Sequence, residues 1–145
     1  MINNEDYFNE NLPAGFDGQF DWDFLKEAFN PTNINFMDLD GIVERNNRFL
    51  IIETKSTGSS IPFGQNMTLN ALHNLGCFTI LYIKGKAGER ITDFSFMFPN
   101  DDKMRKINIL EENPYKAIFK IVQCWFRDAD NYGNKTIKFN NDGNK

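Results

Sequence analysis

Two apolar runs separated by a helical segment constrain this fold more than any other feature. The runs "RFLIIETK" (48–55) and "CFTILYIK" (77–84) have the length and composition of strands buried in a sheet. Between them, "IPFGQNMTLNALHNLG" predicts a helix from about 63 to 75 that stops at Gly76. Its apolar face is predicted to consist of Met67, Ala71, Leu72 and Leu75. A strand, helix, strand crossover that follows a hairpin implies a mixed sheet flanked by helices.

The remaining elements complete an α/β pattern. Further strands are predicted at "NINFMDLDGIVE" (33–44), which the polar link "RNNR" joins to 48–55 as a hairpin, at "RITDFSFMF" (90–98), and at an edge strand "KTIKF" (135–139). Helices are predicted at 21–29 and 113–130. We therefore expect one domain over 1–145, with a core at about 20–127, a flexible N-terminal arm and C-terminal tail, and a central mixed sheet of four to five strands flanked by helices.

Composition limits the possible chemistry. The chain has one histidine, His73, and two cysteines, Cys77 and Cys124, 47 positions apart in apolar segments, so we expect reduced core thiols and no cysteine- or histidine-ligated metal. Any bound metal would need oxygen ligands, which favours Mg²⁺ or Mn²⁺. No apolar stretch is long enough for a membrane span and the N-terminus is acidic and polar, so we expect a cytoplasmic protein.

The net charge of −4 conceals an asymmetry. Residues 1–44 contain ten acids and one base, a balance of −9, whereas residues 45–145 contain ten acids and fifteen bases, a balance of +5. Such a chain can present an acidic site beside a basic surface, although a soluble protein with uneven charge is an equal alternative.

The strand at 48–55 ends on charges that a core does not need. Glu53 and Lys55 share one face of this strand because side chains alternate. On the preceding strand Asp40 shares a face with Asp38, which competes with it as the first acid. If the two faces coincide, Asp40 and Glu53 converge on one divalent cation with Lys55 beside it. The alternative is an exposed ion pair at a strand end, which stabilises little.

The segment "DGIVERNNRFLIIETK" resembles the signature of the PD-(D/E)XK nuclease superfamily, in which an acid ends one strand and E-x-K lies on its hairpin partner. Here Leu39 replaces the usual proline before the first acid. The resemblance covers about 33–84 and implies a restriction-endonuclease-like fold and Mg²⁺-dependent hydrolysis of DNA phosphodiester bonds, with Mn²⁺ as a substitute. It implies that Asp40, Glu53 and the main-chain carbonyl of Thr54 hold the metal, and that Lys55 orients or deprotonates the attacking water.

The resemblance also suggests accessory groups. Relatives often add an acid from the first helix, here Glu27, or Glu10 from the N-terminal arm, and a glutamine from the helix after E-x-K, here Gln65. By analogy the protein would be a homodimer, acting on double-stranded or branched DNA in preference to single strands. Its sequence preference and endo- or exonuclease action stay open.

Contacts to nucleic acid are predicted on a serine-rich loop and on basic edges, whose alternative is a solvated surface. The candidates are Ser56, Ser59, Ser60, Lys84, Lys86, Lys116 and Lys120. Two competing hypotheses remain for the whole chain. One is a non-catalytic module of the same fold that binds nucleic acid or a partner protein, and the other is an unrelated α/β protein with structural acids.

Overall fold

A computed structural model of the chain describes residues 23–85, 90–107 and 113–142. The chain divides into two compact units, Met1–Asp38 and Leu39–Lys145. In the first unit the described residues form a 3₁₀-helix, η2 (Asp23–Phe29), after which the ring of Phe29 meets that of Phe36 edge to face, with centroids 5.7 Å apart. The predicted helix at 21–29 is thus present from residue 23 in the tighter 3₁₀ form, and residues 21 and 22 lie outside the description.

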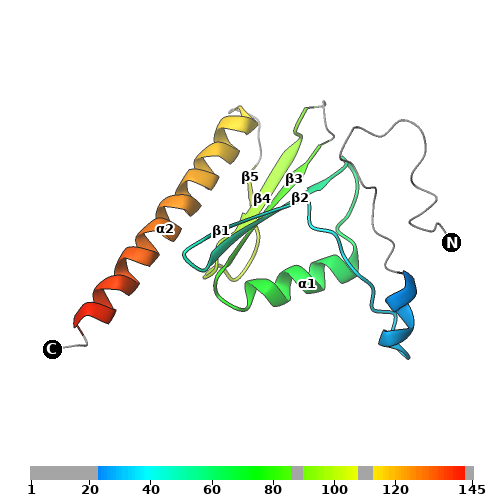
Figure 1. Cartoon of the computed structure of the whole chain (residues 1–145). Coiled ribbons are helices and arrows are strands. Elements are labelled where there is room, and N and C mark those ends of the chain that lie inside the picture. The colour runs from blue at the N-terminus through cyan, green and yellow to red at the C-terminus, as the bar shows by residue number, and fades with distance from the viewer. Residues whose placement is uncertain (1–22, 86–89, 108–112, 143–145) are drawn as a thin grey trace, which may run out of the picture. The chain divides into compact units, whose positions relative to one another are not determined.

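The second unit is built on a mixed sheet of five strands within the described residues. The elements are β1 (Gly41–Arg45), β2 (Arg48–Lys55), α1 (Phe63–His73), β3 (Phe78–Lys84), β4 (Asp93–Met97), β5 (Arg105–Ile107) and α2 (Pro114–Asp142). The strand order is β1-β2-β3-β4-β5, with β2 and β3 parallel and the other neighbouring pairs antiparallel. This confirms the predicted α/β class and the mixed sheet, because the α1 crossover returns the chain parallel to β2 (Figure 1).

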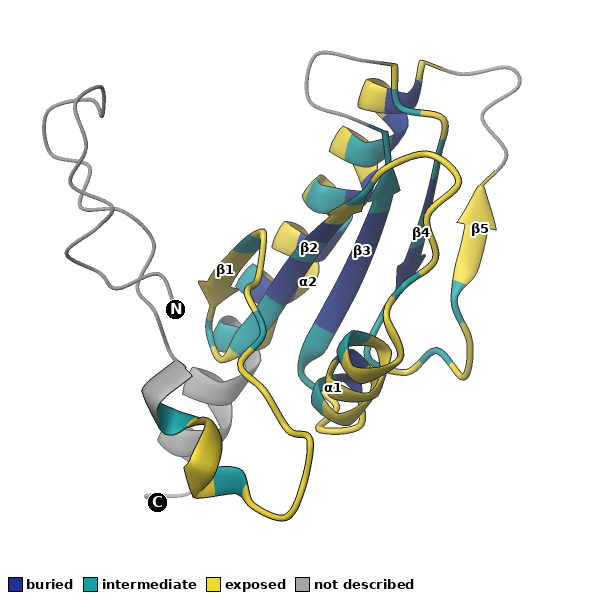
Figure 2. Ribbon diagram, turned by 90° about the vertical axis from the view of Figure 1, so that its right-hand side faces the viewer, coloured by how far each residue is buried: buried dark blue, intermediate teal, exposed yellow. Residues whose placement is uncertain are grey.

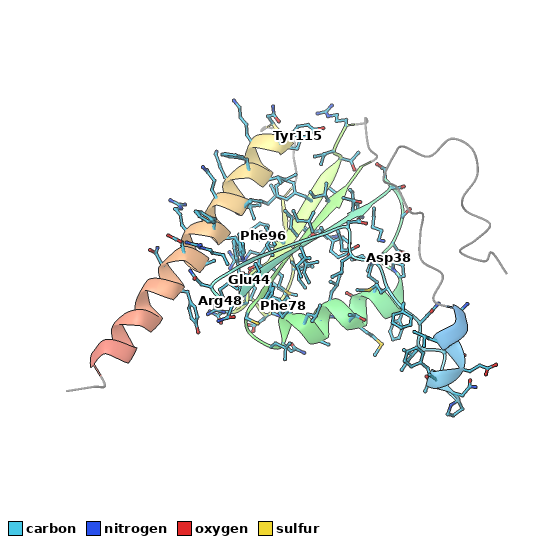
Figure 3. All side chains as sticks on the ribbon, viewed as in Figure 1. Asp38, Glu44, Arg48, Phe78, Phe96 and Tyr115 are labelled. Atoms are coloured by element: carbon cyan, nitrogen blue, oxygen red, sulfur yellow. The ribbon has the colours of Figure 1, made fainter. Side chains whose placement is uncertain are left out.

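The two helices cover opposite faces of this sheet, and each face has its own apolar core. The α2 side is formed by Leu50, Leu81, Phe94, Phe96, Ala117, Ile121, Trp125 and Ala129. The α1 side is formed by Ile51, Leu69, Ile80, Tyr82 and Met97. Figure 3 shows Phe96 toward α2 and Phe78 toward α1. In Figure 2 the central strands β2 and β3 are largely buried, whereas β1 and β5 at the edges are largely exposed.

The hairpin between β1 and β2 closes on two residues. Asn46 and Asn47 both have positive φ, 51° and 59°, as a two-residue type I′ turn requires. The Asn46 side chain donates to the Ala129 carbonyl of α2 at 3.0 Å, and Arg45 pairs with Asp130 at 2.5 Å. Gly133 leaves the room for this contact, since a Cβ there would lie 2.4 Å from the Asn46 side chain. The hairpin is therefore fastened to α2 at its turn.

The predicted strand at 33–44 is wrong over its first eight residues. β1 begins at Gly41, which pairs with Ile52 of β2. Further along β2, the Thr54 amide donates to the side chain of Asp40 and not to a strand backbone. Because that donor is taken, the ladder ends and β1 is limited to five residues.

The predicted apolar face of α1 is correct for Leu72, which packs on the core, and wrong for Met67, Ala71 and Leu75, which are exposed. Met67 and Leu75 are 57% and 68% exposed, whereas Leu69 and His73 are buried. The buried side of α1 includes one polar side chain, that of His73. Its Nε2 forms a hydrogen bond of 2.8 Å with the Phe98 carbonyl, so this ring nitrogen has a partner in the core. The helix ends at His73 and not at 75, and Gly76 follows with φ 76°, as expected of a C-terminal stop.

Two further differences concern the C-terminal half. The segment Arg105–Ile107 forms β5, a strand that the sequence analysis did not predict because its three exposed residues carry no apolar pattern. The predicted edge strand at 135–139 is wrong, since α2 continues to Asp142. Extending an existing helix adds one hydrogen bond per residue without a new nucleus, which outweighs a short β-prone sequence.

No helix of the described residues is long and apolar enough to cross a bilayer. The Cys77 and Cys124 side chains are free thiols, as predicted, and both are half-buried.

Candidate functional site

Glu53 is the most unusual residue of the sheet. It lies near the end of β2, only 1% exposed, on the face that α1 covers. Its Oε2 accepts a hydrogen bond from Gln65 Nε2 at 2.5 Å, so the structure brings Gln65 of α1 to Glu53. In the described part of the chain, Oε1 of Glu53 is the buried side-chain atom that has no hydrogen-bond partner. A buried carboxylate oxygen without a partner is costly unless a proton or a cation occupies it.

Burial also changes the acidity of Glu53. Desolvation raises the pKa of this carboxyl above its ordinary value of 4.5, and the negative charge of Asp40 raises it further. An interaction with the Asp40 backbone amide, the charge of Lys55 and the hydrogen bond from Gln65 oppose the shift without cancelling it. In the absence of a cation, ionised Glu53 is thus under electrostatic strain.

The pKa of Asp40 is shifted in the opposite direction. Its Oδ2 accepts two bonds from Thr54, from the amide at 2.7 Å and from the hydroxyl at 2.6 Å. These bonds and the charge of Lys55 lower the pKa of Asp40 below its ordinary value of 3.8, so this exposed carboxylate stays ionised. Both bonds go to one oxygen, and Oδ1 takes part in neither.

The register of the hairpin brings the two acids together. Ile42 pairs with Ile51 and Gly41 with Ile52, so Asp40 precedes β1 at the level of Glu53 on β2. Asp40 itself lies outside this ladder, and its place beside the end of β2 rests on its two bonds from Thr54 and on the charge with which it raises the pKa of Glu53. Lys55 is half-buried on the same side as Glu53, and its charge acts on both carboxyls. Two carboxyls with oppositely shifted pKa values beside a lysine are typical of functional sites.

The structure adds Tyr82, which sequence reasoning missed. In the parallel register of β2 and β3, Tyr82 lies beside Glu53, and its hydroxyl donates to Gln65 Oε1 at 3.4 Å. Burial and the charges of Glu53 and Asp40 raise the pKa of Tyr82 to about 12. The available signal was a phenol inside the apolar run "CFTILYIK", because a buried tyrosine usually finds a partner for its hydroxyl.

These residues fit a hard divalent cation. The donors are carboxylate oxygens, one of which is buried and unpartnered, and no thiol or imidazole is among them. Across the described ranges, no group of three or more His, Cys, Asp or Glu is close enough to form a metal cage. Mg²⁺ does not need such a cage, since it binds through one or two carboxylates and keeps several waters or substrate oxygens.

The other predicted residues lie as follows. Glu27 is an exposed residue of η2 in the first unit, and Glu10 lies outside the described residues. Asp38 ends that first unit and forms no part of the hairpin. The exposed residues Ser56, Ser59 and Ser60 follow Lys55 in the loop before α1.

The basic candidates divide between the faces of the sheet. Lys84 ends β3 directly beside Lys55 of β2, so the structure brings this pair together at the site. Lys116 and Lys120 are exposed on α2, which packs on the sheet face opposite to Glu53, and they are not brought to the acids. Lys86 lies outside the described residues.

Two clefts of the second unit lie away from the acids. One, of about 350 Å³, is lined by residues that include Arg48, Trp125 and Tyr132, at the other end of β2. The second, of about 460 Å³, is an apolar groove between Val43 of β1 and α2. Neither is lined by Asp40, Glu53 or Lys55, so hydrogen bonds and charges define the candidate site, and neither of these two clefts is part of it.

No protein-family model, curated protein or solved structure matches this chain.

Proposed function

We propose that this protein is a Mg²⁺-dependent nuclease that hydrolyses DNA phosphodiester bonds at Asp40, Glu53 and Lys55, with the fold and chemistry of the PD-(D/E)XK superfamily that its sequence resembles. The observation that carries the proposal is the buried, unpartnered Oε1 of Glu53 beside an ionised Asp40. A core has no use for two neighbouring carboxylates, whereas a divalent cation needs them.

The proposed roles follow from the position of each side chain. Glu53 Oε1 and Asp40 would hold the cation, with the Thr54 carbonyl as the third protein ligand that the resemblance implies. When bound, Mg²⁺ supplies charge neutralisation at the phosphate and a more acidic water. Lys55, whose charge acts on both carboxyls, would orient the attacking water and offset negative charge in the transition state, or in its neutral form would accept a proton from that water.

DNA is the proposed substrate because cations flank the acids on the strand ends. Lys55 and Lys84 are neighbours across β2 and β3, and Ser56 begins the exposed loop beyond them. Paired lysines attract phosphate oxygens, and serine hydroxyls bind them. We further propose a cytoplasmic homodimer that favours double-stranded or branched DNA, which light scattering and a comparison of substrates would test.

The deciding experiment is cleavage of duplex, branched and single-stranded DNA with Mg²⁺, Mn²⁺ or EDTA. We expect metal-dependent cleavage by the unmodified protein and a loss of about 100-fold or more in Glu53→Gln, since the buried metal ligand is removed. Glu44→Gln is the matched control, because Glu44 belongs to the same hairpin but lies at its turn, where it accepts from the Asn47 amide. If the unmodified protein and Glu53→Gln behave alike on every substrate, the enzyme hypothesis fails.

A further inference from the structure

Tyr82 carries a hydroxyl that its packing does not require. Its ring is 3% exposed among Ile51, Leu69, Ile80 and Met97, where a phenylalanine would fill the same space. The hydroxyl points instead to one polar group, the Oε1 of Gln65, at 3.4 Å. A phenol is protonated at neutral pH, so the hydroxyl of Tyr82 is a donor to this amide oxygen.

The side-chain amide of Gln65 forms hydrogen bonds with one residue on each of two adjacent strands, β2 and β3. Its Nε2 donates to Glu53 Oε2 at 2.5 Å, and its Oε1 accepts from Tyr82. Glu53 and Tyr82 are themselves neighbours in the β2–β3 register. A long glutamine side chain on a helix would otherwise sample several rotamers, so contacts at both ends of its amide restrict it to one position.

The position of this amide decides which oxygen of Glu53 is available. Gln65 occupies Oε2, and Oε1 is left without a partner. If the amide moved away, the carboxylate would lose the side-chain hydrogen bond that distinguishes its two oxygens. Groups that orient a metal ligand in this way typically change metal affinity or activity about 10–100-fold when removed.

We propose that Tyr82 is a positioning residue, which acts through Gln65 to hold the Glu53 carboxylate with Oε1 turned toward a divalent cation. This inference rests on the proposed metal site of Asp40 and Glu53.

The test is Mn²⁺ affinity, measured by calorimetric titration of the intact protein and of Tyr82→Phe, Gln65→Ala and the double variant. We expect Tyr82→Phe to weaken Mn²⁺ binding about tenfold, the low end of the usual range, because the hydrogen bond that it removes is long. Gln65→Ala should weaken binding at least as much, and the double variant should equal Gln65→Ala. Tyr132→Phe is the matched control, since Tyr132 stacks on Arg48 at the other end of β2.

Two readouts separate positioning from packing. The melting temperature of Tyr82→Phe in EDTA should stay close to that of the unmodified protein, because the ring is kept. Cleavage by Tyr82→Phe should need more Mn²⁺ for half-maximal rate and recover at saturating Mn²⁺. Unchanged Mn²⁺ affinity in Tyr82→Phe overturns the inference, as does an equal further loss in the Gln65→Ala background. If the unmodified protein binds no Mn²⁺ and cleaves no DNA, the proposed function fails and the inference with it, whereas unaltered Tyr82→Phe in an active protein refutes the positioning role alone.

Discussion

The buried carboxyl of Glu53 should make this protein less stable at neutral pH than a variant without the charge. Burial and Asp40 raise the pKa of Glu53 in the folded protein above 4.5. A group whose folded pKa is raised favours folding while it is protonated, and this contribution is lost as the pH rises through the folded pKa. Glu53→Gln keeps the shape and the acceptor for Gln65 but removes the charge, so it should raise stability in EDTA at pH 7.5.

The magnitude follows from the burial. An unsatisfied buried polar group costs about 1–3 kcal/mol, and the amide that replaces the carboxyl would keep part of that cost, so we expect a gain of about 1–2 kcal/mol. For a chain of this size, each kcal/mol shifts the melting temperature by about 4 °C, which gives a rise of about 4–8 °C. At pH 4, where Glu53 binds its proton, the difference should nearly vanish.

Divalent cations should offset most of this difference in stability. With a dissociation constant of about 1 mM, 10 mM Mn²⁺ would stabilise the unmodified protein by about 1.4 kcal/mol, whereas Glu53→Gln would gain little. Thermal denaturation followed by circular dichroism, at pH 4 and 7.5 with EDTA or Mn²⁺, measures all of these quantities. A Glu53→Gln variant that is less stable than the parent in EDTA at pH 7.5, or a difference independent of pH, would refute the reasoning.

Four further substitutions test the roles of individual side chains in the site and in the core. Asp40→Asn should lower the free energy of unfolding by about 1 kcal/mol, a value kept small because Asp40 is exposed. Because bonds from Thr54 lower the pKa of Asp40, this loss should be present at pH 7 and disappear as the pH falls below 3.8. Urea denaturation at both pH values measures it. Lys55→Met should keep Mn²⁺ binding, measured by titration, yet lower the cleavage rate about 10²–10⁴-fold, and equal rates would exclude Lys55 from the chemistry. Lys84→Ala should weaken DNA binding alike for all sequences and reduce the salt slope by about 1, which fluorescence anisotropy over a range of salt concentrations measures. Leu81→Ala should cost about 2–5 kcal/mol by urea denaturation, because Leu81 is fully buried between the sheet and α2, and a loss below about 1 kcal/mol would contradict that burial.

Local patterns in the sequence predicted most of the sheet. The apolar run 48–55 is β2 to the residue, 77–84 is β3 but for its first position, and the Asn-Asn pair forms the hairpin turn. These features depend on neighbours in the chain, on side-chain alternation and on turn conformations, so the sequence contains their cause. The positions of Glu53 and Lys55 on one strand face followed for the same reason.

Features that depend on contacts between distant segments were not predictable in this way. β1 begins at Gly41 because Asp40 takes the Thr54 amide, a contact across 14 residues. The face that α1 buries, with His73 on it, is set by the Phe98 carbonyl 25 residues away. Apolar periodicity alone cannot reveal a polar residue whose partner lies on another element.

The candidate site likewise combines features that follow from the local sequence with features that depend on contacts between distant segments. From sequence alone, the spacing and residue types of Asp40, Glu53 and Lys55 predict a hard-cation site, since these groups lie on one hairpin whose geometry is local. Tertiary structure decided that Glu53 is buried with one oxygen unpartnered, and that Tyr82 reaches it through Gln65. Burial and the β2–β3 register arise only when α1 and β3 pack against the hairpin, because the desolvation that shifts a pKa comes from neighbours that are distant in the chain.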